Sequence, residues 1–482
     1  MLPRIYLTTT LPYVNADPHL GFAFEVVTAD IVARYRRLFG HEVFFNTGTD
    51  EHGVKVYRAA AGRDLQAYVD DYAGRFQKLK ATLNLTHDHF SRTTDPRHTN
   101  AAQEFWRRCA AAGDIYRKNY PVKYCVGCEL EKTDSELDAG RCPIHPMLTP
   151  ELIEEENYFF RFSKYQKPLL ELYRSRPDFV VPATRLHEIR SFVERGLEDF
   201  SISRLASKMP WGIPVPDDPS QTMYVWFDAL VNYISAIGWP NDLEKFEKWW
   251  PVIQFAGKDN LRQQAAMWQA MLLSASSVSR DGSAGLPPSK QIVIHGFVIS
   301  GGQKMSKSLG NVIDPTTLVE AYGTDAVRYF LARHIEPFED TDVTLQRFKE
   351  IYNANLANGL GNLVSRVMKM ASDHLPRPAA VKKRAITDFP DLLEPLARYE
   401  LNRALDLIWR HVGLHDAYIQ ETKPFNLIKT EPDKAREIIT KLVQGLADLA
   451  VVLEPFLPQT AAAITDLIRE NKPPAKPLFP RK

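Results

Sequence analysis

A strand, a helix and a second strand follow one another within the first fifty residues, and this pattern most constrains the fold. Residues 4–10 (RIYLTTT) predict a β-strand, residues 19–38 predict an amphipathic helix that stops before Gly40, and residues 42–50 (EVFFNTGTD) predict the next strand. A βαβ unit of this kind has parallel strands, with its ligand-binding loops at their carboxyl ends. The sequence therefore predicts an α/β sheet of the nucleotide-binding type.

Strand-like apolar runs return much later in the chain. They lie at residues 222–230 (TMYVWFDAL), 251–259 (PVIQFAGKD) and 290–300 (KQIVIHGFVIS), with helical stretches between them. We predict that one parallel sheet is built from two distant segments. The resulting fold class is a split Rossmann-like α/β domain, whose halves are residues 1–115 and 217–344.

Two further parts of the chain have a different character. Residues 116–216 contain three of the four cysteines, followed by charged helical sequence, and predict a domain inserted into the sheet domain. Residues 345–482 lack strand signals and predict an α-helical bundle. The last twelve residues, NKPPAKPLFPRK, hold too many prolines for a helix, so we expect an extended strap or a frayed end.

The composition fits a globular protein of several domains. A chain of 482 residues suits about three domains of roughly 100 to 200 residues each. With 44% hydrophobic and 25% charged residues, it is neither a disordered nor a collagenous chain. No apolar run approaches the roughly 18 to 20 residues of a transmembrane helix, and no basic leader precedes a hydrophobic stretch at the start. We therefore expect a cytosolic enzyme without a membrane partner.

The net charge of +1 conceals an uneven distribution. Residues 345–482 hold 21 basic and 16 acidic residues, a net charge of +5, whereas the rest of the chain has a net charge of −4. A basic helical domain suits a polyanionic partner, which the overall value does not suggest.

The cysteines point to a metal. Cys125 and Cys128 form a C-x-x-C pair, and after thirteen residues Cys142 and His145 form a C-x-x-H pair. Three thiolates and an imidazole are the ligands of a closed tetrahedral zinc site, and unrelated reduced cysteines are the alternative. Such a zinc has no open position for substrate, so we expect it to fold a knuckle over the mouth of the active site. Cys109 stands apart and predicts a buried small hydrophobe.

Two segments suit a nucleotide. LPYVNADPHLGF turns from strand to helix with His19 and Gly21 at the helix start, where N–H groups and a glycine admit a phosphorylated ligand. A lone histidine there is more often a helix cap or a packing residue. GGQKMSKSLGN, residues 301–311, places Lys304 and Lys307 on a glycine- and serine-rich loop. Two ammonium groups there suit a polyphosphate whose charge grows during reaction, and a solvated basic turn is the alternative.

These two segments resemble the nucleotide-binding signatures of the class I aminoacyl-tRNA synthetases, HIGH and KMSKS. Further segments narrow the resemblance to the methionyl-tRNA synthetase family. They are LPYVNADPHLG, FNTGTDEHG, the four-residue Cys/His knuckle, EENYFFRFSKY, SISR, WGIPVP, YVWFDAL, GKD and LGNVIDP. The resemblance covers nearly the whole chain.

The resemblance implies a methionine–tRNA ligase. Methionine would attack the α-phosphorus of ATP, which binds with Mg²⁺, and the methionyl-adenylate would acylate the terminal ribose of tRNA(Met). No covalent nucleophile is needed, so catalysis rests on alignment and electrostatic stabilisation. By resemblance, His19, Gly21, Lys304 and Lys307 are catalytic and also bind ATP together with Ser306. Lys307 is the strongest catalytic prediction.

The resemblance also implies a methionine pocket and an anticodon site. A thioether suits an apolar, aromatic pocket, although each aromatic residue alone would more often belong to the core. The residues implied to bind methionine are Leu11, Tyr13, Trp226, Ala229, Tyr233, Gln264 and Trp268, with Asp50 on the α-ammonium. Those implied to bind the anticodon are Asn362 and Arg366, which share one helix face four residues apart, and Phe425, which would stack on a base.

Three residues depart from the family pattern. Phe22 replaces the second histidine of HIGH, Gln264 replaces a histidine near the substrate sulfur, and Phe425 replaces a tryptophan. They leave open a tRNA-independent amino-acid ligase that acts on a small molecule, and a catalytically silent RNA-binding relative. The retained Asn362 and Arg366, the helical domain and the unchanged KMSKS segment favour the tRNA ligase. We expect a monomer, because no appended C-terminal tRNA-binding domain is evident.

Overall fold

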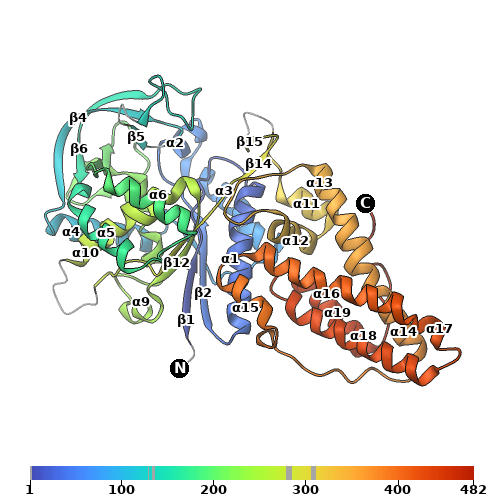
Figure 1. Cartoon of the computed structure of the whole chain (residues 1–482). Helices are drawn as coiled ribbons and strands as arrows, with labels where there is room; N and C mark the ends of the chain where they lie inside the picture. The colour runs from blue at the N-terminus through green and yellow to red at the C-terminus, as the bar shows by residue number, and fades with distance from the viewer. Residues whose placement is uncertain (1–2, 129, 133–135, 278–284, 306–310) are drawn as a thin grey trace.

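A six-stranded parallel sheet forms the centre of the computed structural model, which describes residues 3–128, 130–132, 136–277, 285–305 and 311–482 (Figure 1). In spatial order, its strands are β3 (His89–Arg92), β2 (Glu42–Thr49), β1 (Arg4–Thr8), β12 (Val252–Gly257), β13 (Gln291–His295) and β7 (Val180–Val181). Strands β1 and β12 are neighbours in space although they are far apart in the sequence. The predicted split α/β sheet is therefore confirmed.

Strand β1 lies at the centre because both of its faces are apolar. Ile5 and Leu7 pack into the core on one face, and Tyr6 packs into a second core on the other. A strand buried on both faces is typical of parallel sheets covered by helices. The chain continues from β1 to β2 on one side, whereas β12 leads to β13 on the other. This reversal of strand order opens a crevice at the carboxyl ends of β1 and β12.

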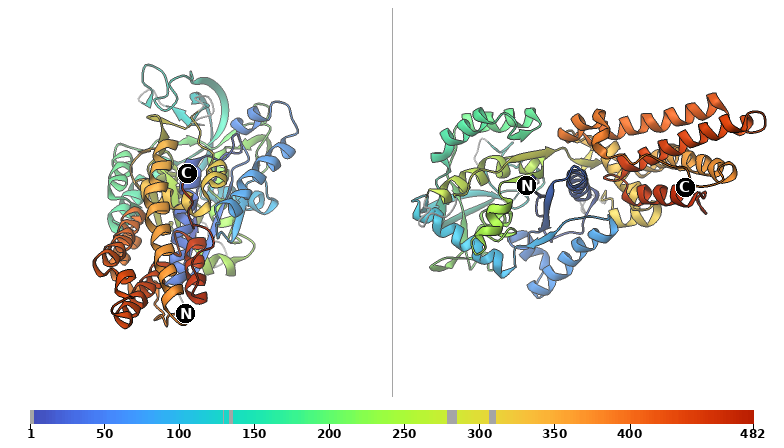
Figure 2. Two further views of the ribbon diagram at one scale, coloured as in Figure 1. Left: turned by 90° about the vertical axis from the view of Figure 1, so that its right-hand side faces the viewer. Right: turned by 90° about the horizontal axis from the view of Figure 1, so that it is seen from below.

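Helix α1 (Leu20–Leu38) connects β1 to β2 and lies between the central sheet and the C-terminal helices (Figures 1 and 2). His19 caps its first turn. The helix ends at Leu38, with Phe39 as its C-cap, because Gly40 adopts a φ of 82°, a left-handed conformation that glycine tolerates best. The Tyr35 hydroxyl donates a hydrogen bond to the Leu396 carbonyl, 2.7 Å away, and so joins this helix to the C-terminal domain.

The remaining helices of the sheet domain cover its faces and edges. They are α2 (Val54–Ala60), α3 (Leu65–Thr82), α4 (Pro96–Ala111), α7 (Val225–Ala229), α8 (Asn232–Ser235), α9 (Leu243–Trp249), the π-helix η4 (Gln263–Met267), α10 (Trp268–Ser276), α11 (Pro315–Tyr322) and α12 (Thr324–His334). A small sheet of β14 (Val298–Ser300), β15 (Gln303–Lys304) and β16 (Thr341–Asp342) follows β13.

The predicted insertion contains a sheet of its own. The antiparallel strands β4 (Ile115–Cys125), β5 (Leu130–Lys132), β6 (Glu151–Phe160) and β8 (Phe200–Ser201) pair in it, and α5 (Gln166–Ser175) and α6 (Ala183–Glu194) lie in the same segment. Strand β7 belongs to this segment by sequence but pairs with β13 in the central sheet. The segment thus contributes to two sheets, and the boundaries at residues 115, 216 and 344 stay a prediction.

The strand expected at residues 222–230 is only half correct. Strand β11 (Asp218–Met223) pairs with β9 (Ser203–Leu205) and β10 (Pro214–Val215) in a small sheet outside the central one, and residues 225–229 form α7. A short apolar run that is buried on all sides has no distinct period, so periodicity alone does not separate a strand from a helix there.

The C-terminal part is the expected helical bundle. Its elements are α13 (Leu345–Ile351), the π-helix η6 (Tyr352–Gly361), α14 (Asn362–His374), α15 (Pro390–Ala397), α16 (Leu401–Thr422), α17 (Pro424–Leu427), α18 (Pro432–Leu453) and α19 (Pro458–Glu470). The tail forms the strap rather than a frayed end. Phe479 is buried, the Tyr352 hydroxyl donates to the Pro480 carbonyl at 2.9 Å, and Asn353 exchanges two hydrogen bonds with the backbone of Lys482.

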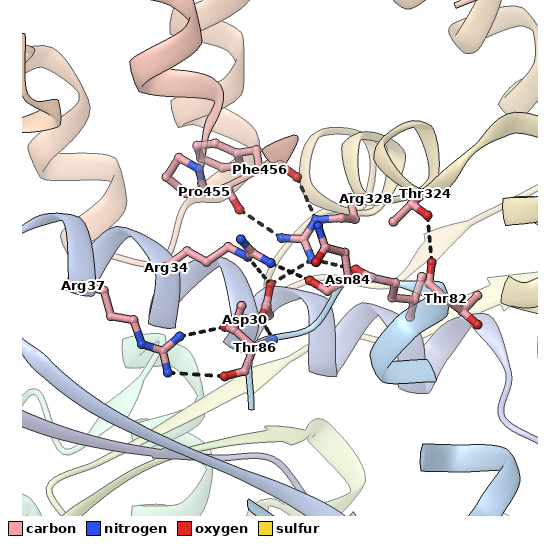
Figure 3. A network of polar contacts seen from close by, with 11 residues as sticks. Asp30, Arg34, Arg37, Thr82, Asn84, Thr86, Thr324, Arg328, Pro455 and Phe456 are labelled. Carbon is pink, nitrogen blue, oxygen red and sulfur yellow. Dashed lines mark hydrogen bonds and ion pairs between the residues drawn. The ribbon is translucent and has the colours of Figure 1, made fainter. Parts of the chain in front are cut away.

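A buried ion pair joins the sheet domain to this bundle (Figure 3). Arg328 of α12 and Asp30 of α1 are both fully buried and lie 2.8 Å apart. The same guanidinium donates to the carbonyls of Leu83, Pro455 and Phe456 at 2.9–3.0 Å, and the last two form the turn between α18 and α19. One side chain therefore holds three parts of the chain together.

Asp30 is equally well satisfied. Its Oδ1 accepts from the backbone and hydroxyl of Thr86 at 2.6 and 2.7 Å, and Arg34 donates to its Oδ2 at 2.8 Å. Burial raises the pKa of Asp30, but Arg328 and Arg34 lower it more, so that it lies below its ordinary value of 3.8. The stabilisation is thus complete above the pKa of the unfolded carboxyl group and is lost only as the pH falls through the lower folded value.

Replacing Arg328 should destabilise the fold strongly. We expect Arg328→Met to lose about 3 to 5 kcal/mol of unfolding free energy, because Asp30 would keep a buried charge without its main partner. Urea unfolding followed by far-UV circular dichroism measures this loss. Asp406→Asn is the matched control. It removes the ion-pair partner of Arg333, which lies on α12 like Arg328, but Asp406 is 64% exposed, so the loss of unfolding free energy should be less than about 1 kcal/mol. Equal losses of unfolding free energy for the two variants would contradict the role of the buried Asp30–Arg328 pair in joining the domains.

Candidate active site

A cavity of about 380 Å³ opens at the carboxyl end of the central sheet. Residues that follow four adjacent strands line it, namely Tyr13 after β1, Asp50 after β2, Asp259 after β12 and Gly296 after β13. The cavity therefore occupies the crevice that the reversal of strand order creates, which is where ligands bind in open α/β sheets.

The structure brings most of the predicted small-molecule site residues together. Those that line the cavity are His19, Gly21, Leu11, Tyr13, Asp50, Trp226, Ala229, Tyr233 and Gln264. Trp268 does not line it. Its fully buried ring packs between Phe105 and Tyr233, with ring centroids 5.4 and 6.0 Å away, and so supports the wall from behind.

Only part of the KMSKS segment can be placed. Lys304 ends strand β15, and Met305 lines the cavity. Ser306 and Lys307 lie outside the described residues. The backbone of this segment thus reaches the cavity directly before the residues for which the phosphate-binding role is predicted.

His19 begins α1 and its ring caps the helix. Its Nδ1 accepts from the backbone N–H groups of Gly21 at 3.1 Å and Phe22 at 3.4 Å. A neutral imidazole that accepts at Nδ1 carries its proton on Nε2, so the ring offers a donor on its other side. A Cβ at Gly21 would lie 3.0 Å from this ring, which explains the glycine. The same ring orientation therefore caps the helix through Nδ1 and leaves Nε2 as a hydrogen-bond donor.

Phe22 fills the position of the missing histidine with an apolar contact. Its ring meets Phe76 edge-on, with centroids 5.2 Å apart, and also lines the cavity. The aromatic ring therefore belongs both to the packing of α1 against α3 and to the cavity wall.

A buried histidine and glutamate, not expected from the sequence, join three elements at the cavity. The Glu25 carboxylate of α1 accepts from the backbone and hydroxyl of Thr10 at 2.7 and 2.6 Å, and its other oxygen lies 2.8 Å from Nε2 of His295. Nδ1 of His295 lies 2.7 Å from the Gly296 carbonyl. Both ring nitrogens thus face acceptors, which a charged imidazolium satisfies. Burial lowers the pKa of His295, but Glu25 raises it more, to above its ordinary 6.5.

Asp50 is held at the cavity by its own backbone. Its N–H donates to the Pro12 carbonyl at 2.9 Å, and its carbonyl accepts from Val14 at 3.2 Å, so that Tyr13 lies beside it. Only 4% of Asp50 is exposed. Its Oδ1 also accepts from the backbone N–H of His52 at 3.4 Å. A carboxylate at this position suits a cationic group of a ligand.

A second carboxylate supports the cavity wall that Trp226, Ala229 and Tyr233 form. Asp228 is fully buried in α7, and its two oxygens lie 2.7 Å from His52 Nδ1 and His98 Nε2. The same short helix carries Trp226 and Ala229 to the cavity. Asp228 thus fixes α7 against the loop after β2 and against α4.

The four predicted metal ligands converge. The ligand atoms of Cys125, Cys128, Cys142 and His145 all lie within 4.8 Å of one another. Sulfur atoms bound to one tetrahedral zinc at 2.3 Å lie about 3.8 Å apart, so this cluster has the right size and chemistry. A Cβ at Gly127 would lie 2.4 Å from the His145 ring, so the knuckle requires glycine there.

The knuckle also contributes to the cavity. Gly127, Cys128, Ile144 and His145 are among the residues that line it. The inserted segment therefore forms one wall of the site, and the predicted position of the knuckle at the mouth of the cavity agrees with this geometry.

The predicted anticodon residues lie in the helical bundle, in the first two turns of α14 and in α17. Asn362 is exposed, and Arg366 one turn later lies 2.9 Å from Asp416 of α16. Phe425 is 44% exposed at the start of α17. Figure 1 shows α17 at the far end of the bundle from the central sheet.

Comparisons with known proteins agree with this geometry. The family model described as class I tRNA synthetases (M) matches residues 5–148 and 136–368. The methionine–tRNA ligase of Thermosynechococcus vestitus is 43% identical, and the match covers 96% of this chain and 90% of that protein. The chain belongs to the methionyl-tRNA synthetase family. As a member, it is an aminoacyl-tRNA synthetase, a ligase. The methionine–tRNA ligase of Thermotoga maritima is 39% identical over 98% of this chain and 76% of its own length.

Solved structures of methionyl-tRNA synthetases share the fold. The Mycobacterium tuberculosis enzyme in complex with methionyl-adenylate matches with a TM-score of 0.88 and 37% identity, over 96% of this chain and 94% of that one. The free form of the same enzyme matches with a TM-score of 0.83 and 33% identity, over 100% and 99% of the two chains. Among the described residues of the present synthetase, no helix is both long and apolar enough to cross a membrane.

The contact between Glu25 and His295 leads to a testable prediction for the pKa of His295. In Glu25→Gln the carboxylate that raises the pKa of His295 is lost, so burial should lower that pKa below its wild-type value. Histidine ring signals followed by NMR across the pH range measure the shift. Glu42→Gln, at an exposed carboxylate of β2, is the control and should leave the His295 signal unchanged. An unaltered His295 titration in Glu25→Gln would contradict the pairing.

Proposed function

We propose that this synthetase activates methionine with ATP and transfers the methionyl group to the terminal ribose of tRNA(Met). One observation carries the proposal: a single cavity joins the nucleotide residues His19 and Gly21 to Asp50 and the aromatic wall around Tyr233. A structurally similar synthetase binds methionyl-adenylate, which is the product of the first step. Family membership supports the second step.

The nucleotide side of the cavity should stabilise the departing pyrophosphate. The Nε2 donor of His19 and the ammonium groups of Lys304 and Lys307 are proposed to meet the phosphates of ATP, which enters with Mg²⁺, and Ser306 joins them. Gly21 permits close approach. Because methionine supplies the attacking carboxylate, these groups act by alignment and charge stabilisation.

The opposite side should bind methionine. Asp50 is proposed to hold the α-ammonium, and the apolar wall encloses the thioether chain. Leu11, Tyr13, Trp226, Ala229, Tyr233 and Gln264 make this wall, and Trp268 supports it from behind. A pocket of this composition favours an apolar side chain of matching size over larger or charged ones.

The knuckle should hold one structural zinc. Three thiolates and the His145 imidazole leave no position for substrate, so the metal would stabilise the wall that Cys128 and His145 form. The Lewis-acid strength of zinc is not needed for amino-acid activation at such a closed site.

Metal analysis tests the knuckle directly. We expect wild-type protein to contain one zinc per chain and Cys142→Ser to lose it, with faster proteolytic cleavage between residues 116 and 160, because the knuckle would unfold. Cys109→Ala is the matched control, since this buried cysteine lies outside the ligand cluster and should leave the zinc content unchanged. A full zinc content in Cys142→Ser would contradict the ligand set.

The helical bundle should read the anticodon. Asn362 and Arg366 present an amide and a guanidinium on one face of α14, and the exposed Phe425 is available to stack on a base. The net charge of +5 over residues 345–482 favours the approach of tRNA. We further propose that the protein acts as a cytosolic monomer.

Two assays on one preparation test the function. When each amino acid is tested in turn, we expect pyrophosphate exchange with methionine. The same preparation should then charge tRNA(Met). Arg366→Ala should retain pyrophosphate exchange. Its kcat/KM for tRNA charging should fall by the equivalent of about 1 to 3 kcal/mol, because the variant lacks an anticodon contact. Arg398→Ala is the matched control, since this exposed arginine of the same domain pairs with Glu394.

The alternatives give different results. Methionine-dependent exchange without charging of any tRNA would favour a ligase that acts on a small molecule. The absence of exchange with every amino acid would favour a silent RNA-binding relative. Equal charging by Arg366→Ala and wild type would refute the anticodon assignment alone.

A further inference from the structure

Four buried polar side chains, three amides and one serine hydroxyl, lie in a row at and behind the cavity wall. We call this row the amide relay. Gln264 at the cavity is followed inward by Gln254 of β12, Ser289 before β13 and Gln269 of α10. None of the four is more than 2% exposed, and only Gln264 lines the cavity. Polar groups so deeply buried are retained at a cost unless each hydrogen bond is made, so the direction of every bond matters.

A backbone group fixes the direction of the innermost link. The N–H of Ser289 donates to Oε1 of Gln269 at 2.9 Å. Because a backbone N–H can only donate, the Gln269 amide has one orientation, and its NH₂ must face the other way. That NH₂ donates to Oγ of Ser289 at 3.2 Å and to the main-chain carbonyl of Gln264 at 2.7 Å. Gln269 therefore fixes both the next link and the backbone of the π-helix η4.

The remaining links follow in order. Since Oγ of Ser289 accepts from Gln269, its hydrogen goes to Oε1 of Gln254, 2.7 Å away. The NH₂ of Gln254 then donates to Oε1 of Gln264 at 2.8 Å, and the NH₂ of Gln264 donates to the Tyr233 hydroxyl at 2.8 Å. Each bond between these side chains thus points from the core toward the cavity, whereas the Ser289 backbone N–H points inward to Gln269.

The last members of this relay are donors at the cavity. Gln264 directs its NH₂ to the Tyr233 hydroxyl, and both residues line the cavity. Because this hydroxyl accepts from Gln264, its own hydrogen points away from Gln264. Burial raises the pKa of Tyr233 well above its usual range, so the phenol keeps this hydrogen. A histidine at position 264 would gain or lose a proton near neutral pH, whereas the glutamine relay contains no group that does.

We propose that Ser289, Gln269 and Gln254 are positioning residues for substrate selection, because they fix the inner cavity wall as a hydrogen-bond donor surface. The wall would then favour a side chain that has a hydrogen-bond acceptor at the position of the methionine sulfur. It would disfavour norleucine, which has a methylene group at that position. The inference rests on the proposed function, since it presupposes that methionine binds there. A thioether is a weak acceptor, and norleucine would leave the buried donor without a partner.

Ser289→Ala tests the relay with little change in volume. It removes the hydroxyl link but keeps the backbone N–H that orients Gln269, so Gln254 and Gln264 lose their fixed direction. We expect the ratio of kcat/KM for methionine to that for norleucine in pyrophosphate exchange to fall by on the order of tenfold. The loss should appear as a higher KM for methionine with kcat little changed, because the contact exists before the reaction begins. Ser289→Thr, which retains the hydroxyl, should restore the ratio.

Two further variants separate selection from packing. Gln254→Met is similar in size to glutamine and offers no hydrogen bond, so it should lower the ratio as Ser289→Ala does. Ser274→Ala is the matched control, because Ser274 is an equally buried serine that donates to Asp114 outside the relay. It should leave the ratio unchanged.

The outcomes are distinct. An unchanged ratio in Ser289→Ala and Gln254→Met, or a parallel loss of activity with both substrates, would overturn the inference and leave the relay a packing feature. If wild-type protein does not exchange pyrophosphate with methionine, the proposed function fails instead.

Discussion

The buried pair of Asp30 and Arg328 is the interaction on which the arrangement of the parts depends. A charge removed from water is tolerated only where partners surround it, and here Arg328 has a carboxylate and three carbonyls, while Asp30 has two guanidinium groups and Thr86. The pair fixes α1 to α12 and to the turn between α18 and α19. Figure 3 shows this pair with its partners, which join the helical bundle to the middle of α1. The N-terminal end of the same helix carries the His19 cap.

The second constraint is the order of the parallel strands. Because β1 is central and its neighbours β2 and β12 continue in opposite directions, four strand ends meet around one opening. The end of β1 brings an aromatic ring, the ends of β2 and β12 each bring a carboxylate, and the end of β13 brings His295, which is paired with Glu25. The inserted knuckle then closes the side that the sheet leaves open.

Features encoded locally could be predicted from the sequence, and features that depend on distant partners could not. The βαβ unit, the metal ligands and the strand-end motifs are short patterns, and the structure brings them together as expected. The pairing of β7 with β13, the contact of Glu25 with His295 and the amide relay join residues without a shared period. Residues 225–229 form a helix where the sequence predicts a strand, because full burial removes the alternation that distinguishes the two structures.

The position of α1 limits how a movement of the helical bundle can reach the cavity. Its last turns are joined to the bundle through Tyr35 and Leu396, its middle through Asp30, and its first turn carries the His19 cap. A helix with its hydrogen bonds intact moves as a rod, so a shift of the bundle must either break the carbonyl contacts of Arg328 or displace the donor of His19. Breaking these contacts would leave the fully buried Arg328 guanidinium without partners, a cost that displacement of the helix as a unit avoids. A movement of the bundle would therefore act on the His19 side of the cavity before the wall that Trp226 and Tyr233 form.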